Sequence, residues 1–159
     1  MTAMLRAIRA FVGMFAIVGA AILVAPTLAG AQTGKLIDPN AATESELAQL
    51  PFMTPATVKS LMEQRPFKTV LELNKFLLDQ KLNAVQAREF YRKAFVLINL
   101  NTAAREELLL IPGVGARMAS ELTEYRPWKT WAQFDKEIGK YVGQQETDRL
   151  KQYVFIPPG

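Results

Sequence analysis

The chain has 159 residues, of which 19 are basic and 15 acidic, giving a formal net charge of +4. This length suits one ordinary domain or two very small ones. Cysteine and histidine are both absent, which excludes disulfides, thiolate metal sites, cysteine nucleophiles and any Ser-His-Asp triad. The carboxylates stand in no recognisable paired or metal-ligand spacing. We therefore predict a protein that is not an enzyme and that uses no cofactor, no metal and no small-molecule substrate.

Residues 1–31 have the three parts of a secretory signal peptide. Two arginines come first, Ala10 to Ala25 is uncharged and mostly apolar, and Ala29-Gly30-Ala31 offers the small-x-small pattern that signal peptidase requires. The apolar run is shorter than the roughly 20 residues that span a bilayer as a helix. We predict cleavage after residue 31 and a periplasmic or secreted protein. The alternative is an uncleaved N-terminal helix that anchors the chain.

Removing the predicted signal peptide lowers the net charge. Two of the basic residues and none of the acidic ones lie in residues 1–31, so the remaining chain carries +2. A dedicated nucleic-acid binder usually shows a stronger basic excess. Any contact with DNA must therefore come from local geometry.

The rest of the chain is an internal repeat. At an offset of 61, residues 36–75 align with residues 97–136 without a gap, and 14 of the 40 positions are identical. The longest shared block is Arg65-Pro66-Phe67-Lys68-Thr69, which matches Arg126-Pro127-Trp128-Lys129-Thr130. We predict two tandem units, residues 32–96 (repeat 1) and residues 97–159 (repeat 2).

Each unit is predicted to contain about four short helices, so the fold class is all-α. The predicted helix starts are the capping boxes Thr43-x-x-Glu46, Thr69-x-x-Glu72 and Thr130-x-x-Gln133, the pair Thr54-Pro55, and Asn83 and Gly143 for the fourth helices. Thr102 replaces the lost cap at Ala104. No segment alternates with period two, so we predict no substantial sheet, and short apolar segments close each unit. Each unit is expected to have its own small apolar core.

The first two helices of repeat 2 are joined by Ile111-Pro112-Gly113-Val114-Gly115, followed by Ala116-Arg117. This sequence closely resembles the helix-hairpin-helix signature. With Ile98 to Ala103 and Tyr125-Arg126, it resembles the ComEA-like branch, whose members are exported DNA receptors of natural competence. The resemblance implies two tandem helix-hairpin-helix units, the first degenerate, and sequence-independent binding to the phosphate backbone of double-stranded DNA. It also suggests a role in DNA uptake.

Physical chemistry explains why glycine suits both positions of this motif. Gly113 can adopt positive φ and turn the chain, and Gly115 has no side chain to keep a phosphate from the amides that open the next helix. Arg117 adds a charged contact. Lys140 stands in a second, weaker candidate hairpin. The predicted DNA-binding residues are Gly113, Val114, Gly115, Ala116, Arg117 and Lys140.

Repeat 1 departs from the motif. Its equivalent turn is Leu50-Pro51-Phe52-Met53-Thr54-Pro55-Ala56, which has no glycine, no amide hydrogen at Pro55 and no arginine. We predict that repeat 1 is structural. Phe52 and Met53 either are exposed for a protein contact or pack back on their own unit.

Residues kept in both repeats are predicted to be structural. Arg65 and Arg126 precede prolines at predicted helix ends, where a guanidinium can bond free carbonyls. Trp128, Trp131 and Phe134 are predicted to be core residues, because Phe67, Val70 and Leu73 hold the same places in repeat 1.

Two functions remain in competition. The first is an exported protein that binds duplex DNA. The second is an exported helix-hairpin-helix scaffold that binds other exported or membrane proteins and no DNA; the low net charge and the altered turn of repeat 1 favour it. A dinucleotide site is disfavoured, because the turn lacks a third glycine and no strand is predicted before it.

Overall fold

The computed structural model of the protein describes residues 34–158. The predicted signal peptide, its cleavage site and the alternative membrane anchor all lie outside these residues. Among residues 34–158, no helix has the length and apolar character needed to cross a membrane.

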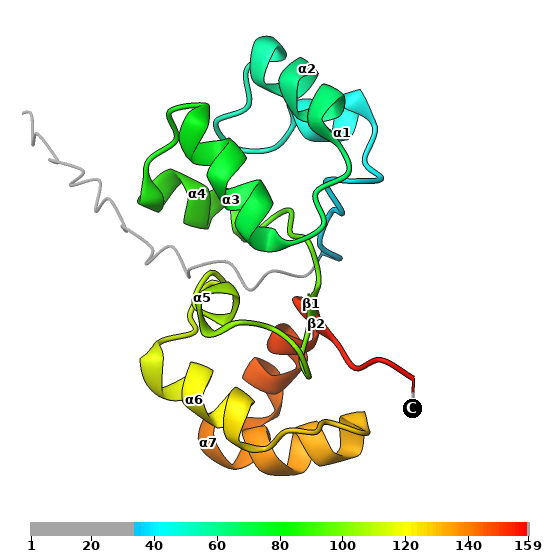
Figure 1. Ribbon diagram of the computed structural model, residues 1–159, viewed down its shortest axis with the longest axis vertical. Helices are drawn as coiled ribbons and strands as arrows, with labels where there is room; N and C mark the ends of the chain where they lie inside the picture. The colour runs from blue at the N-terminus through cyan, green and yellow to red at the C-terminus, as the bar shows by residue number, and fades with distance from the viewer. Residues whose placement is uncertain (1–33, 159) are drawn as a thin grey trace, which may run out of the picture. The chain divides into compact units, whose positions relative to one another are not determined.

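The described chain is mainly helical, which confirms the predicted class (Figure 1). Repeat 1 contains α1 (Glu44–Ala48), α2 (Pro55–Gln64), α3 (Val70–Asp79) and α4 (Ala84–Tyr91). Repeat 2 contains β1 (Ile98–Asn99), α5 (Arg105–Leu108), α6 (Ala116–Glu124), α7 (Trp131–Lys151) and β2 (Val154–Phe155). Residues 34–158 form one compact unit.

The helices of repeat 1 begin where their capping residues predict. Thr43 and Asn83 each form a complete capping box, with Glu46 and Gln86. Thr54 caps α2, with Pro55 in its first position. These signals are local, which is why the sequence alone locates them.

Three caps differ in detail from the prediction. At α3 and α7 the threonine hydroxyl accepts the expected amide, but the returning Glu72 and Gln133 side chains accept from Lys68 N and Lys129 N, one residue before the cap. At α5 the capping position is Ala104, not Thr102. Ala104 has no side-chain acceptor, so only its own amide bond to Glu107 Oε2 (2.8 Å) is made.

The predicted start of a fourth helix in repeat 2 appears as a break inside α7. Gly143 has φ 77° and ψ 170°, outside the helical region. A residue with a β-carbon rarely adopts such a φ, so glycine suits this position. The chain becomes helical again after it.

Short parallel pairs close each repeat, a feature that the sequence analysis did not anticipate. Ile98 and Asn99 of β1 pair with Val154 and Phe155 of β2, and Ile37 forms an isolated parallel bridge with Ala94. Each pair joins the first residues of a repeat to its last. These segments are too short for a period-two pattern, which is why the sequence gives no strand signal.

Equivalent polar residues of the two repeats make equivalent hydrogen bonds. Asn40 exchanges two hydrogen bonds with the backbone of Phe67, and Asn101 does the same with Trp128. The Arg65–Pro66 and Arg126–Pro127 peptide bonds are both cis. The duplicated sequence therefore has a duplicated local structure.

The two arginines of the shared block bond backbone carbonyls, but not those of their own helices. Arg126 donates to Leu100 O (2.6 Å) and Ala103 O (2.7 Å), and Arg65 donates to Ala42 O (2.8 Å). These carbonyls belong to the segments before α5 and α1. Each guanidinium thus ties the end of one helix to the start of its repeat.

The buried apolar residues of residues 34–158 form one cluster that draws on both repeats, rather than two separate cores. Phe95 of repeat 1 packs edge-on against Tyr153 of repeat 2 at a centroid distance of 5.0 Å. Trp128 and Phe134 are buried as predicted. The prediction for Trp131 is wrong: its side chain is 39% exposed, and its ring makes an edge contact with the buried Phe134.

Candidate nucleic-acid interface

The turn between α5 and α6 has the predicted sharp bend. Gly113 has φ 86°, in the left-handed region that favours glycine. Val114 closes the turn with a hydrogen bond from its amide to Ile111 O (3.0 Å), and its side chain is buried. Of the predicted contact residues, Val114 is therefore directed into the core and has no free amide to offer a ligand.

The amides at the start of α6 are open. Gly115 is the capping residue, with an extended φ of −96° that any residue can adopt. A β-carbon added there would meet no atom within 4 Å. The amides of Ala116, Arg117 and Met118 donate no hydrogen bond within the described chain. Neither backbone conformation nor packing requires glycine at position 115, and its effect is to leave these donors uncovered.

The equivalent turn of repeat 1 follows the same path with its donors removed. Phe52 has φ 63° in the place of Gly113. Pro55 has no amide hydrogen, and the Thr57 amide donates to the Thr54 hydroxyl (3.1 Å). Of three first-turn positions, only Ala56 keeps an uncommitted amide. The Phe52 side chain is 47% exposed, whereas Met53 packs against the core.

The structure brings Arg117 and Lys140 to one aromatic ring. The Arg117 guanidinium lies 5.8 Å and the Lys140 ammonium 5.1 Å from the centroid of Tyr141. The Tyr141 hydroxyl is 3.1 Å from that of Tyr125. The two predicted basic residues, from α6 and α7, therefore share one exposed surface, although they are 23 positions apart in the sequence.

Ionisation in this cluster is set by its hydrogen bonds. Lys140 Nζ donates to Glu137 Oε2 (2.8 Å) and to the Tyr125 hydroxyl (2.7 Å), which raises the pKa of Lys140 and lowers that of Glu137. Hydrogen bonding with Tyr125, then with Glu121, raises the pKa of Tyr141 to about 12. Lys140 is thus fully charged at neutral pH, but part of its charge is already balanced.

Two further arginines, which the sequence motif does not mark, lie close to the turn. Arg105 donates to Ala116 O (2.9 Å) and Ser120 Oγ (2.8 Å). Arg149 Nη2 would lie 3.1 Å from a β-carbon on Gly113, and the guanidinium forms a two-bond pair with Glu146. The repeat alignment could have identified Arg105, because it aligns with Glu44 and the charge at this position is therefore reversed between the repeats. No comparable signal marks Arg149.

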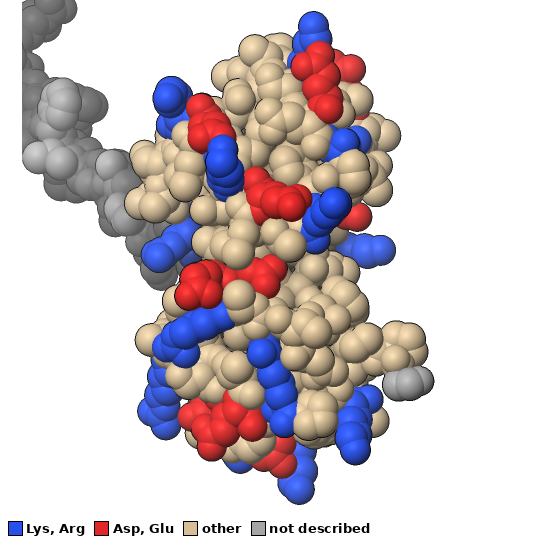
Figure 2. Space-filling view, viewed as in Figure 1, with Lys and Arg blue, Asp and Glu red and all other residues tan. Residues whose placement is uncertain are grey.

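Acidic side chains lie among these basic ones. Glu137 pairs with Lys140, and Glu146 pairs with Arg149. Figure 2 shows Lys and Arg side chains interspersed with Asp and Glu over the face in view. This surface favours contact with a few phosphates at one place over contact with many phosphates along a continuous basic stripe.

Within residues 34–158, no group of three or more acidic side chains is placed to hold a metal ion. Comparison with protein-family models, with curated proteins and with solved structures finds no match for this chain. The geometry of the turn and the contrast between the two repeats are therefore the observations that bear on function.

Proposed function

We propose that the chain is an exported, two-unit helix-hairpin-helix protein of the ComEA-like type, which binds the phosphate backbone of duplex DNA through the turn before α6. A phosphate oxygen would accept hydrogen bonds from the amides of Ala116 and Arg117, and the Arg117 guanidinium would add a charged contact. Such contacts read no base edge, so binding would be independent of sequence. DNA uptake is the process that the resemblance suggests.

The observation that carries this proposal is the set of three uncommitted amides opening α6. The nine-residue helix places the positive end of its dipole at the same point. In repeat 1, a proline and a threonine hydroxyl remove two of the three donors without changing the path of the turn. The difference between the repeats therefore changes the donors available to an anion and leaves the path of the turn unchanged, which supports the proposal.

Basic residues support the same assignment. Arg105, Arg117 and Lys140 correspond to Glu44, Ala56 and Asp79 in repeat 1. All three lie against the first turn of α6 or share the Tyr141 ring with it. Repeat 2 also gains Glu106 and Glu137, so the change is local and adds little to the net charge.

The test is a salt-dependent titration of the purified protein with two unrelated duplexes. Arg117→Ala should weaken binding to both duplexes equally and reduce the slope of log affinity against log salt by about one, the loss of one neutralised phosphate. Gly115→Thr, which copies Thr54, should weaken binding further, because its hydroxyl can take an α6 amide and its bulk crowds the others.

Thr54→Ser and Ala56→Ser are the matched controls in repeat 1, and both should bind DNA as the wild type does. Wild-type affinity should lie near the non-specific range of roughly 10⁻⁴ to 10⁻⁶ M, because one turn makes few contacts. Equal binding by wild type and Arg117→Ala, or no binding by either at low salt, would refute DNA binding by this turn.

A scaffold without DNA binding is the second candidate function. The carboxylates of Glu137 and Glu146 beside Lys140 and Arg149 favour it, because these pairs reduce the positive charge available to a phosphate. The exposed Phe52 at the turn of repeat 1 is also a feature that a protein contact would explain. Failure of the DNA titration would leave this candidate.

A further inference from the structure

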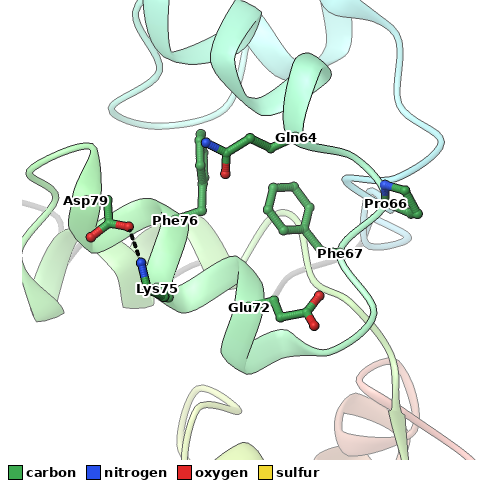
Figure 3. Close-up of a pocket in the computed structure, with 7 residues that line it drawn as sticks. All are labelled: Gln64, Pro66, Phe67, Glu72, Lys75, Phe76 and Asp79. Carbon is green, nitrogen blue, oxygen red and sulfur yellow. Dashed lines mark hydrogen bonds and ion pairs between the residues drawn. The ribbon is translucent and has the colours of Figure 1, made fainter.

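Repeat 1 contains a pocket that the DNA proposal does not use. It has a volume of about 230 Å³ and lies between the end of α2 and one side of α3 (Figure 3). Phe67 and Phe76, whose ring centroids are 5.4 Å apart, form an aromatic wall. The remaining lining residues are Gln64, Pro66, Glu72, Lys75 and Asp79.

In repeat 2 the corresponding residues fill this space themselves. The caps of α3 and α7 align at Thr69 and Thr130, so Gln64 corresponds to Tyr125 and Asp79 to Lys140. The Tyr125 ring lies 6.0 Å from Trp128, and the Lys140 ammonium lies 4.5 Å from the centroid of that ring and bonds its hydroxyl. The repeat thus carries its own aromatic ring and its own cation at this position.

Repeat 1 has lost both of these groups. Gln64 supplies no ring, and Asp79 puts a carboxylate where the ammonium stands in repeat 2. Lys75 is paired with Asp79 at 2.7 Å, and Glu72 adds a further negative charge, so the rim is acidic overall. Phe76, in the place of Glu137, makes the wall more apolar. At these two positions repeat 1 therefore lacks the ring and the ammonium group that repeat 2 carries.

We propose that this pocket binds an aromatic side chain, flanked by a basic residue, from a partner protein. The pocket is an open depression of about 230 Å³, which has room for one side-chain ring. The ring packs against Phe67 and Phe76, and the basic side chain of the partner lies near Asp79 and Glu72. An acidic rim repels phosphate, so nucleic acid is disfavoured here. Repeat 1 would then hold a protein while repeat 2 holds DNA.

The test is an NMR titration of the ¹⁵N-labelled protein with the peptide acetyl-Lys-Tyr-Lys-amide. Shifts should saturate and centre on Gln64, Phe67 and Phe76, with a Kd on the order of 1 to 10 mM, as expected for one buried ring. Acetyl-Glu-Tyr-Glu-amide should bind about two- to fivefold more weakly, because the rim charges are exposed. Acetyl-Lys-Ala-Lys-amide should produce no saturable shift.

The matched variant is Gln64→Tyr with Asp79→Lys, which gives repeat 1 the two groups of repeat 2 and should weaken peptide binding at least about tenfold. Met62→Tyr, on the same helix but outside the pocket lining, should bind as the wild type does. Gln64→Ala, which only widens the pocket, should retain binding and guards against a folding defect in the double variant.

Three results would overturn the proposal: equal binding of the tyrosine and alanine peptides, undiminished binding by the double variant, or shifts centred away from these residues. Pocket signals that move with protein concentration alone would also overturn it, because the occupant would then be a second copy of the chain. None of these outcomes depends on DNA binding, so the two proposals fail separately.

Discussion

The turns that lead into α2 and α6 follow the same path but differ in most of the groups that an anion would meet. Phe52 and Gly113 both have positive φ, and Thr54 and Gly115 both cap the next helix with extended backbone. The Thr54 hydroxyl accepts a hydrogen bond from the Thr57 amide in the first turn of α2, whereas Gly115 has no side-chain acceptor. The backbone of this turn is therefore compatible with either chemistry.

The surfaces beside the shared Arg-Pro blocks also differ, but here it is repeat 1 that has the open site. Near α6 the space beside the shared Arg-Pro block is filled by Tyr125 and Lys140, while near α3 the same space is an acidic pocket. Each repeat therefore leaves open a site that the other fills. A duplicated unit can diverge in this way because the hydrogen bonds of Asn40, Arg65 and their counterparts hold the frame.

The largest loss of DNA binding is expected when repeat 2 is given the charges of repeat 1. Arg105→Glu, Arg117→Ala and Lys140→Asp in one chain should reduce affinity for any duplex about a hundredfold at low salt and lower the salt slope by about three. Binding titrations across a salt series check this. Replacing Lys59 and Lys93 of repeat 1 by glutamate and Lys75 by alanine changes the net charge by the same amount and should have a much smaller effect.

The arginines of the shared block should affect stability and leave affinity alone. Arg126→Ala removes bonds to two backbone carbonyls and should lower the free energy of unfolding by about 3 kcal/mol. Arg65→Ala removes one such bond, and Arg65 Nε is buried without a partner in the described chain, so about 1.5 kcal/mol is expected. Urea unfolding measures both, and equal losses would contradict the structural difference between the repeats.

The sequence predicts those parts of the fold that depend on neighbouring residues. Caps such as Thr43 and Asn83 act within three residues, so their signals can be read directly. The parallel pairing of Ile98 with Val154 and the exposure of Trp131 depend on segments far apart in the chain, and no local pattern encodes them.

The candidate site shows the same limit. Gly113 has the predicted positive φ, because the motif describes a local turn. The placing of Arg105 and Arg149 against that turn and the burial of Val114 depend on how α5, α6 and α7 pack. The pocket of repeat 1 is recognised only when its lining is compared with the filled position in repeat 2.

Substitutions at Gly113 and Phe52, the two turn residues with positive φ, should change the free energy of unfolding by smaller amounts and in opposite directions. Gly113→Ala introduces a β-carbon at φ 86° and crowds Arg149, so we expect a loss of about 1 to 2 kcal/mol. Phe52→Gly removes that strain at φ 63° and should stabilise the protein by up to about 1 kcal/mol, since its ring is half-exposed. Thermal unfolding of both variants checks the pair. Destabilisation by Phe52→Gly would show that the Phe52 ring contributes packing that outweighs its backbone strain.

The smallest expected effect is that of pH on DNA binding, because no group at the turn before α6 titrates near neutrality. The chain has no histidine. The hydrogen bond from Lys140 to Glu137 raises the pKa of Lys140, so Lys140 stays charged to higher pH than an ordinary lysine. Affinity at constant ionic strength should therefore stay constant between about pH 6 and about pH 9.

Outside that window, the direction in which DNA affinity changes follows from the group that titrates. As the pH falls through the lowered pKa of Glu137, Lys140 loses its carboxylate partner and affinity should rise. As the pH approaches about 12, Tyr141 ionises beside Arg117 and affinity should fall. A tenfold change between pH 6 and pH 8 would require a titrating group that this surface does not contain, and would place the DNA contact elsewhere on the protein.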